Sequence, residues 1–404
     1  MNKSIVIINQ YIGSPHHGME YRHYYLAKHL VSLGYKVTLV SGSYSHLFSS
    51  PPQVKGSFTR ENIDGVEYIW VKVPKYRSSK SIGRIWNMIV FAWKLRYLHL
   101  DPAHILVSSP SLFPVRTGKR MAQKFGTKFL FEVRDIWPLT LVELSGLKAS
   151  HPLIRIMKYY EKFAYCNADK VISLLPQAKE HFVTHGMSES KFVYLPNGIE
   201  VRSEDQAKLP SHIQRQIPKD KFIIAYTGTI GIANNVQYLI ETAEVLEAYT
   251  DIHFMILGQG GEKQKLQEKV RRSGLQNVTF LEPVKRDLVG SFLSRIDVAF
   301  ISLLPEDLFR FGVSPNKVFE YMYAKKPIIW AIEAGNDPVK EAACGVNVPL
   351  NDKDALKEAI LELKALPVEK REELGQNGYN FVKTRHSYGM LAKKLMKIIE
   401  EKYV

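Results

Sequence analysis

The segment from Phe311 to Trp330 joins a turn of small residues to a helix that carries an acid. It reads FGVSPNKVFE at its start, and the spacing predicts a helix that begins near Asn316. A turn of this kind presents backbone N–H groups to a phosphate, and Lys317 adds positive charge in the first helical turn. Glu320 lies one turn inside the helix, where its carboxylate can accept both hydroxyls of a ribose. An acid so placed also stabilises the helix electrostatically, so Glu320 alone leaves both explanations open.

Two glycine-containing loops follow buried strands in the same half of the chain. Tyr226–Gly231 reads YTGTIG and leads to a helix near Asn234, and Leu257–Gly261 reads LGQGG after the next strand. Glycine permits close backbone approach, and a helix N-terminus offers free N–H groups to a pyrophosphate. A tight strand-to-helix turn is the other explanation for each loop. The fingerprint Gly-x-Gly-x-x-Gly is absent from the start of either half, which argues against a dehydrogenase.

Polar residues also follow strands in the first half. Arg134 and Asp135 come directly after a strand, where they could bind an acceptor hydroxyl or phosphate and stabilise a leaving group. A buried structural ion pair is the alternative. His16 and His17 precede Gly18 in the first strand-to-helix loop, a position more typical of surface histidines than of ligands.

The cysteine and acid patterns do not indicate a metal site or a disulfide framework. Cys166 and Cys344 are isolated from each other and from other cysteines. The one Asp-x-Asp, at 352–354, opens a C-terminal helix and fits an N-cap better than a metal ligand pair. We therefore expect chemistry without a metal. The N-terminus returns to polar sequence after a few apolar residues, so we expect neither a signal peptide nor a spanning helix there.

Alternating strands and helices must position these loops. Short apolar strands separated by helices are typical of a parallel sheet covered on both faces. The series restarts after a polar linker that begins at Pro196, so we expect an α/β protein with two doubly wound domains facing a cleft. The first domain should span 1–199 and the second 200–385, and a last helix should span 386–404. The expected strands are 5–8, 36–41, 66–73, 105–108, 128–133, 170–174, 191–195, 222–226, 253–257, 278–281, 298–301 and 327–330.

The charge is unusual for a chain of ordinary globular composition. Its 404 residues include 55 Lys+Arg and 40 Asp+Glu, a net charge of +15. Residues 1–200 hold 26 basic and 13 acidic residues, a net of +13, which leaves +2 for the rest. Such an excess indicates an anionic partner: nucleic acid, an anionic membrane or a phosphate-bearing substrate. No helix-turn-helix, zinc or basic repeat module is visible, which disfavours nucleic acid.

One basic, aromatic-rich stretch accounts for part of this charge. Arg77, Lys80 and Arg84 lead into the apolar residues 82–100, which charged residues interrupt too often for a membrane span. We interpret the basic leading end as a contact with anionic lipid. We interpret Trp86–Leu98 as a crossover helix that buries an apolar face against the sheet and leaves some residues exposed.

In order and spacing, these motifs resemble retaining glycosyltransferase family 4, which has the GT-B fold. The resemblance covers nearly the full chain and is greatest to the bacterial O-antigen and capsule aminosugar transferases, typified by L-N-acetylfucosaminyl transferases. It implies that the C-terminal helix 386–404 crosses back to the first domain. The segments that carry it are GME at 18–20, LGYKVTLV at 33–40, SSP at 108–110, FEVRDIWP at 131–138, LPNGI at 195–199, ILGQG at 256–260, RIDVA at 295–299 and the 311–330 segment.

The resemblance implies roles residue by residue. Glu320 matches the second glutamate of the family's Glu–seven residues–Glu signature, which holds the nucleotide ribose, while the first glutamate would fall at Gly312 and is missing. The family's Arg and Lys after the second domain's first strand are also missing, so Lys317, and next Arg310, are the candidates to neutralise the diphosphate. Further implied donor-binding residues are Gly228, Thr229, Gly231, Gly258, Val284, Val313, Ser314, Pro315 and Asn316.

In the first domain the resemblance places Arg134 and Asp135 where many relatives have a histidine that faces the donor sugar. Gly18 would let the backbone approach the acceptor diphosphate or donor phosphate, with His16 beside it and His17 donating a proton or hydrogen bond. The implied reaction is retaining, metal-independent transfer of an N-acetylated 6-deoxy aminosugar from a UDP-sugar. The implied acceptor is a polyprenyl-diphosphate-linked saccharide, used in lipopolysaccharide or capsule synthesis by a cytoplasmic enzyme held at the inner membrane. A UDP-sugar epimerase of the GT-B fold is the alternative.

Overall fold

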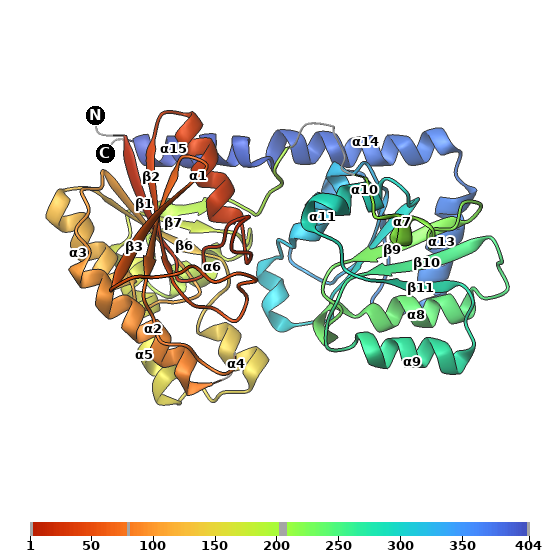
Figure 1. Ribbon diagram of the computed structural model, residues 1–404, viewed down its shortest axis with the longest axis horizontal. Coiled ribbons are helices and arrows are strands. Elements are labelled where there is room, and N and C mark those ends of the chain that lie inside the picture. The colour runs from red at the N-terminus through yellow and green to blue at the C-terminus, as the bar shows by residue number, and fades with distance from the viewer. Residues whose placement is uncertain (1–2, 79–80, 202–207, 402–404) are drawn as a thin grey trace. The chain divides into compact units, whose positions relative to one another are not determined.

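The structure, a computed structural model, describes residues 3–78, 81–201 and 208–401. Its contacts divide the chain into two compact units, each with its own sheet (Figure 1). The first unit comprises Met1–Glu200, Phe311–Ser314 and Tyr388–Val404. The second comprises Val201–Arg310 and Pro315–Ser387.

A single sheet forms the centre of the first unit. Within the described residues its strand order is β3-β4-β2-β1-β5-β6-β7-β8, and the pairings are parallel except for the antiparallel edge between β3 and β4. Every residue of β1 and of β6 is buried, as a sheet covered on both faces requires. The strands are β1 (Ser4–Ile8), β2 (Lys36–Gly42), β3 (Phe58–Ile63), β4 (Val66–Val71), β5 (His104–Ser108), β6 (Lys128–Val133), β7 (Lys170–Ser173) and β8 (Phe192–Tyr194).

Helices cover both faces of this sheet (Figure 1). On one face, Leu26 and Leu30 of α1 share a core with Leu391 and Leu395 of α15 and with Ile7 of β1. The last helix therefore belongs to the first unit. The helices of the first unit are α1 (Arg22–Ser32), α2 (Ile82–Lys94), α3 (Val115–Phe125), α4 (Leu139–Ser145), α5 (Pro152–Asn167), α6 (Lys179–Thr184) and α15 (Tyr388–Glu400), with 3₁₀ turns η1 (Leu95–Tyr97) and η2 (Glu189–Lys191).

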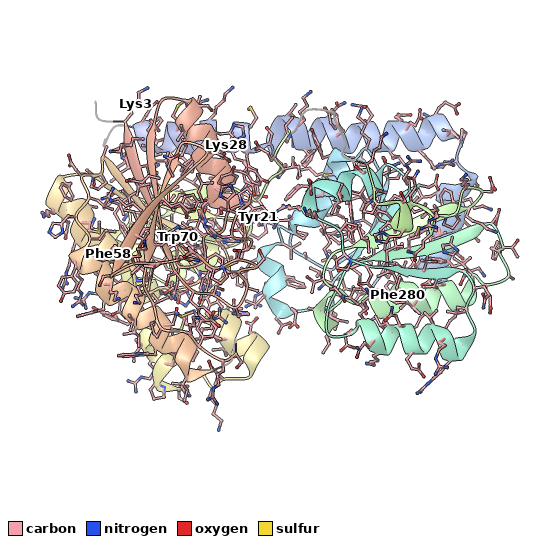
Figure 2. The ribbon with its side chains drawn as sticks, in the orientation of Figure 1. Lys3, Tyr21, Lys28, Phe58, Trp70 and Phe280 are labelled. Carbon is pink, nitrogen blue, oxygen red and sulfur yellow. The ribbon has the colours of Figure 1, made fainter. Side chains whose placement is uncertain are left out.

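The second unit has a parallel sheet with the order β11-β10-β9-β12-β13-β14. Figure 2 labels one core-facing strand residue of each unit, Trp70 in β4 and Phe280 in β11. The strands are β9 (Phe222–Thr227), β10 (Ile252–Leu257), β11 (Val278–Leu281), β12 (Val298–Ser302), β13 (Ile328–Ala331) and β14 (Gly345–Asn347). The helices are α7 (Ser211–Gln214), α8 (Val236–Val245), α9 (Lys263–Ser273), α10 (Val289–Leu293), α11 (Asn316–Tyr323), α12 (Pro338–Glu341), α13 (Lys353–Ala365) and α14 (Val368–Arg385), with 3₁₀ turns η3 (Ile232–Asn234), η4 (Arg286–Leu288) and η5 (Asp307–Phe311).

The two sheets confirm the predicted α/β class, but the domain limits need a correction. We predicted one continuous second domain over 200–385, whereas Phe311–Ser314 belongs to the first unit. We also predicted one helix over 386–404. The structure ends α14 at Arg385 and starts α15 at Tyr388, so His386 lies between two helices.

The helix after the basic stretch is the predicted crossover helix, since α2 connects β4 to β5. It buries one apolar face through Met88, Phe91 and Leu95, and Trp86 and Trp93 are among the residues it leaves exposed. Lys80, part of the predicted lipid contact, lies outside the described residues. Across the described parts of the chain, we find no helix with the length and apolar character needed to cross a bilayer.

Candidate functional site

The two glycine loops of the second unit interlock at the carboxyl ends of β9 and β10. Gly228 N donates to Leu257 O at 2.9 Å, and Ile230 N donates to Gln259 O at 2.8 Å. A Cβ at position 258 would lie 1.9 Å from the Gly228 carbonyl oxygen, so only glycine fits there. The structure thus brings together at one edge of the sheet the predicted loop residues Gly228, Thr229, Gly231 and Gly258.

Lys317, in the first turn of α11, reaches these loops. Its Nζ donates to the Tyr226 hydroxyl at 2.6 Å and to Asn234 Oδ1 at 2.9 Å, and it lies 3.3 Å from where a Cβ of Gly228 would be. The Tyr226 hydroxyl in turn donates to Thr229 O at 2.6 Å. Burial lowers the pKa of Lys317 to about 8. The Tyr226 hydroxyl and the Asn234 amide are both neutral, so they do not cancel the charge of this lysine.

The start of α11 is fixed to the end of β9 by a tyrosine. The Tyr321 hydroxyl accepts from Thr227 N at 2.8 Å, and Tyr321 is fully buried. This anchor holds the first helical turn, including Lys317, beside the Gly228 loop. In the same turn Asn316 Oδ1 is buried and has no hydrogen-bond partner among the described residues, so it can accept from a ligand.

Glu320 lies one turn further along α11 and meets a residue that follows β11. Arg286 Nη2 donates to Glu320 Oε1 at 3.1 Å, and the carboxylate stays about one-fifth exposed. Val284, the predicted base contact, is two residues before Arg286 and is half-buried. The sequence did not predict Arg286 as a partner, because the pairing joins two strand ends that only the sheet order brings together.

The predicted donor turn is divided between the two units. Within the first unit, Asn197 N donates to Ser314 Oγ at 2.9 Å and Asn197 Nδ2 donates to Ser314 O at 2.8 Å. Val313 is buried in that unit, whereas Pro315 and Asn316 belong to the second. Arg310 is exposed and its guanidinium donates to the Asp307 carbonyl, so it does not join the Lys317 group.

In the first unit, the loop after β1 folds back on itself. Gly13 N donates to Glu20 O at 3.0 Å, and Gly18 has a φ of +81°, a left-handed conformation that favours glycine. His17 Nδ1 contacts Ser50 O at 2.7 Å and Nε2 contacts Glu61 Oε2 at 3.0 Å. Both ring nitrogens are therefore engaged, and we now interpret His17 as an anchor of the loop in place of a proton donor.

His16, the other predicted loop ligand, is exposed. Arg134, which follows β6, makes an ion pair with Glu20 of this loop. Its Nη1 donates to Glu20 Oε2 at 2.8 Å, while Glu20 Oε1 accepts from Arg22 N at 3.0 Å. Asp135 is exposed and forms no ion pair with the residues that the structure describes. The sequence left open an ion pair between Arg134 and Asp135. In the structure Arg134 pairs with Glu20 instead.

Behind this pair lies a charged network that the sequence did not reveal. Glu132 is buried and accepts from Arg22 Nη2 at 2.9 Å, from Ser108 Oγ at 2.7 Å and contacts His23 Nε2 at 2.8 Å. Burial alone would raise the pKa of Glu132, but Arg22 and His23 hold it well below its ordinary value. Arg22 also donates to Leu195 O at 2.9 Å, which ties α1 to the end of β8.

Asp352 is an N-cap, as the sequence predicted. Its Oδ1 accepts from Ala355 N at 3.0 Å at the start of α13, which is the hydrogen bond of an N-cap. In the described residues, no three His, Cys, Asp or Glu side chains gather closely enough to hold a metal ion.

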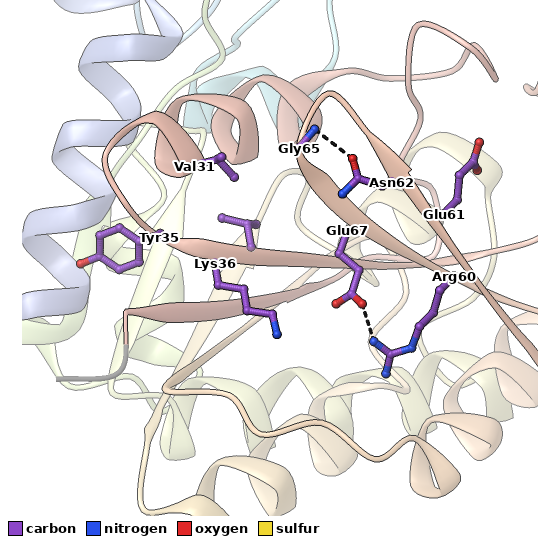
Figure 3. Close-up of a pocket in the computed structure, with 9 residues that line it drawn as sticks. Val31, Tyr35, Lys36, Arg60, Glu61, Asn62, Gly65 and Glu67 are labelled. Atoms are coloured by element: carbon purple, nitrogen blue, oxygen red, sulfur yellow. Dashed lines mark hydrogen bonds and ion pairs between the residues drawn. The ribbon is translucent and has the colours of Figure 1, made fainter.

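A hollow of about 380 Å³ lies elsewhere in the first unit (Figure 3). It is lined in part by Lys36, the first residue of β2, so it opens at the amino ends of parallel strands, opposite the loops described above. Its charged residues are largely paired, because Arg60 binds Glu67 and Thr38 Oγ1 donates to Glu67 at 2.7 Å. None of the predicted site residues lines it.

The second-unit group has the chemistry to bind a nucleoside diphosphate. One uncancelled cation and two close-packed glycine loops suit a diphosphate, and a carboxylate one helical turn away can accept the hydroxyls of a ribose. The first-unit group offers a guanidinium held by an acid at the end of β6, beside a glycine loop.

Both halves of the chain match known family models. Residues 209–381 match the model described as "Glycosyl transferases group 1", and residues 17–198 match "Glycosyl transferase 4-like domain". Among curated proteins, one named for a glycosyl transferase of colanic acid biosynthesis, WcaI of Escherichia coli, is 24% identical over 48% of this chain and 49% of its own length. The chain therefore spans about half the length of that relative. WbjE of Pseudomonas aeruginosa, named for a glycosyltransferase, is 22% identical over 75% of this chain and 78% of its own length.

Solved structures share the fold over nearly the whole chain. The sucrose-phosphate synthase of Thermosynechococcus elongatus has a TM-score of 0.72 at 17% identity and covers 98% of each chain. HepE of Anabaena, solved with UDP and glucose, has a TM-score of 0.67 at 14% identity and covers 98% of this chain and 99% of its own.

Proposed function

Because this chain is a glycosyltransferase with a group 1 domain and the GT-B fold, we propose that it transfers a sugar from a UDP-sugar to a polyprenyl-diphosphate-linked saccharide. The proposed product is a bacterial surface polysaccharide, and the proposed sugar is an N-acetylated 6-deoxy aminosugar. The proposed place of action is the cytoplasmic face of the inner membrane.

The placement of Lys317 and Glu320 on one helix carries the donor part of the proposal. Lys317 reaches the Gly228 loop, and Glu320 lies one helical turn away with its carboxylate partly exposed. A diphosphate on the lysine and a ribose on the glutamate fit this order. Group 1 glycosyltransferases use nucleotide-sugar donors, and HepE was solved with UDP and glucose, which favours uridine here.

The relatives and the charge support the acceptor part. WcaI is named for colanic acid biosynthesis. The net charge of residues 1–200 is strongly positive, which suits a diphosphate-linked acceptor at an anionic membrane. In this proposal Arg134 binds the acceptor or the developing charge, with Gly18 lining the acceptor side.

We further propose that transfer needs no metal and retains the anomeric configuration. Lys317 and the interlocked glycine loops would neutralise the leaving diphosphate, which is the task a metal performs in other transferases. The described first-unit groups include no carboxylate pair suited to a covalent intermediate, so the acceptor hydroxyl would attack from the leaving-group face.

The test begins with binding and ends with transfer. Thermal shift and calorimetry of the full chain with UDP, GDP and their sugar conjugates should show stabilisation by UDP and by one UDP-sugar above the others. Mass spectrometry should then show addition of that sugar to a synthetic polyprenyl-diphosphate saccharide, unchanged by EDTA. NMR of the product should show the donor's anomeric configuration.

Glu320→Ala should abolish transfer, with Glu247→Ala, at an exposed glutamate of the same unit, as the matched control. Stabilisation by no nucleotide, or transfer that survives Glu320→Ala, would overturn the proposal. Deuterium incorporation into the UDP-sugar from deuterated water, without transfer, would favour an epimerase.

A further inference from the structure

Helix α2 and the turn after it present a stripe of large apolar residues to solvent. The stripe residues and their exposed fractions are Ile82 84%, Trp86 57%, Ile89 40%, Trp93 49% and Tyr97 56%. Their spacing of four, three, four and four residues places them on one helical face. The opposite face of the helix is buried through Met88, Phe91 and Leu95. That face packs in the core, so the stripe is not needed there. A contiguous exposed apolar surface of this kind marks an interaction site.

The stretch of sequence that contains the stripe is strongly cationic. Between Glu67 and Glu132 the only acidic residue is Asp101. The same span holds 12 basic residues: Lys72, Lys75, Arg77, Lys80, Arg84, Lys94, Arg96, Arg116, Lys119, Arg120, Lys124 and Lys128. Of these, Lys72, Lys75, Arg77 and Arg96 are exposed close in sequence to the two ends of the stripe.

Helix α5 lies on the same side of the sheet as α2 and adds residues of the same two kinds (Figure 1). Ile156 and Tyr159 are exposed apolar residues on it, and Arg155 and Lys158 are exposed cations next to them. Arg116 of α3 stacks 5.9 Å from the Tyr159 ring centroid. The combination of apolar residues with cations and almost no acids therefore continues beyond α2.

The combination of exposed apolar residues with cations indicates which partner binds this surface. A second copy of the chain would bring two cationic faces together in a symmetric dimer, which like-charge repulsion opposes. Nucleic acid would satisfy the cations but not the tryptophans and isoleucines on a regular helical face. A bilayer with anionic head groups satisfies both, because the apolar stripe enters the head-group and acyl boundary while the cations meet the lipid phosphates.

We propose that α2 is an interfacial helix that docks the first unit on an anionic membrane through the stripe Ile82, Trp86, Ile89, Trp93 and Tyr97. The proposal deepens the proposed function, since a lipid-linked acceptor is presented at such a surface, and it reverses our prediction that only the basic leading end contacts lipid.

The buried side of α2 connects the docking surface to the loop after β1. Arg84 Nε donates to the Tyr11 hydroxyl at 3.2 Å, and Asn87 binds Gln10. Tyr11 lies two residues before Gly13, where the loop folds back toward Glu20. Docking through the outer face of α2 would therefore hold this loop, and with it the Glu20–Arg134 pair, at the membrane surface.

The test uses the purified full chain and vesicles of phosphatidylcholine with or without phosphatidylglycerol. Co-sedimentation at low salt should show that the chain binds vesicles with phosphatidylglycerol more strongly than vesicles without it. High salt should weaken the binding to the anionic vesicles. The double variant Trp86→Ser/Trp93→Ser should lower the binding at least roughly tenfold, because each substitution removes an aromatic side chain that enters the lipid in this proposal. Both residues are exposed, so the fold should tolerate the change. Val368→Ser/Tyr249→Ser removes exposed apolar residues from the second unit and is the matched control.

UDP affinity, measured on each variant, separates this proposal from the proposed function. Loss of vesicle binding with unchanged UDP binding supports the docking surface, and a wild-type chain that binds vesicles but no UDP would overturn only the proposed function. Equal binding to both vesicle types, or wild-type binding by the double tryptophan variant, would overturn the docking surface. So would a dimer that the tryptophan substitutions dissociate, or a preference for DNA over anionic vesicles at equal salt.

Discussion

Lys317 Nζ lies 2.6 Å from the hydroxyl of Tyr226, a residue 91 positions earlier in the chain, at the end of β9. The contact holds a cation beside the Gly228 loop through a neutral group. An ion pair would have fixed the lysine equally well but would have cancelled its charge. A phosphate that enters the loop therefore meets a positioned positive charge and does not have to displace a carboxylate.

Substitution of Lys317 should weaken nucleotide binding. Lys317→Met keeps the length of the side chain but removes a charged hydrogen bond, whose contribution of about 1.5–3 kcal/mol corresponds to a roughly 10- to 150-fold loss of UDP affinity. Calorimetry with UDP measures this, and uridine, which lacks the diphosphate, should bind the variant and the wild type equally. An equal loss for uridine would show that the lysine acts on the fold of the site and not on the phosphates.

The lowered pKa of Lys317 predicts a pH dependence near neutrality. Burial sets this pKa at about 8, so the unliganded lysine loses its proton as the pH rises through 8. UDP affinity should accordingly fall between pH 7 and pH 9, with proton uptake on binding near pH 8. The profile should flatten in Lys317→Arg, because a guanidinium stays protonated throughout this range. A wild-type profile as flat as that of the variant would contradict the assignment.

Glu320 should determine the preference for an intact ribose. Two charge-assisted hydrogen bonds to the ribose hydroxyls predict that the wild type binds UDP at least roughly tenfold more tightly than 2′,3′-dideoxy-UDP. Glu320→Gln should bring the two affinities close together. Arg286→Gln, which removes the 3.1 Å ion pair to Glu320, should alter overall affinity but retain the preference. Loss of the preference in Arg286→Gln alone would move the ribose contact to Arg286.

Arg134 should act on turnover and not on donor binding. Its guanidinium belongs to the first unit and is held by Glu20 at 2.8 Å. Arg134→Ala should lower kcat by about 10²–10³, the usual effect of a lost electrostatic donor, with the UDP affinity unchanged. Glu20→Gln should lower kcat less, since it loosens the arginine without removing it. Arg60→Gln, in the first unit beside the Figure 3 hollow, is the control and should leave kcat unchanged.

The Glu132 network should control stability and its dependence on acid. Glu132→Gln leaves Arg22 buried without its charged partner, which costs about 3–5 kcal/mol of unfolding free energy. The folded pKa of Glu132 lies well below that of the unfolded chain, so its stabilisation is complete above roughly pH 4.5 and is lost as the pH falls further. Denaturant unfolding of both forms measures this loss, which Glu132→Gln should lack. Glu67→Gln breaks the partly exposed pair with Arg60 and should cost less than about 1 kcal/mol.

The sequence predicted the strands and loops that hydrophobic patterning marks directly. β6 and β11 have the predicted limits, and the start of α11 at Asn316 was predicted as well, because a Gly, Ser and Pro turn precedes an amphipathic run there. β3 was missed because the four polar residues 59–62 separate its two apolar ends, so neither an apolar run nor an alternating pattern marks this half-exposed edge strand. The sequence predicted that some residues of α2 stay exposed but not that Trp86 and Trp93 are among them, because periodicity alone cannot say which side of an apolar helix meets the sheet.

The sequence predicted individual residues of the site but not the residues that they bind. Lys317 and Glu320 were found from their place after a turn, and Arg134 from its place after a strand. Their partners Tyr226, Arg286 and Glu20 come from other strand ends, and only strand order brings them near. The Glu132 network is the extreme case, since it joins residues about 110 positions apart that patterning would assign to an ordinary strand and helix.

The return of α15 to the first unit has a consequence for the order in which the chain can fold during synthesis. The residues of α15, among them Leu391, Leu395 and Ile399, complete a core whose other members lie before residue 200. The second unit has all of its residues by Ser387, so it can close while α15 is still being made. The unit that is translated first therefore completes its folding last. Until then the apolar face of α1 stays exposed, where chaperones or other chains can bind it. A fragment that stops near residue 200 should aggregate for the same reason.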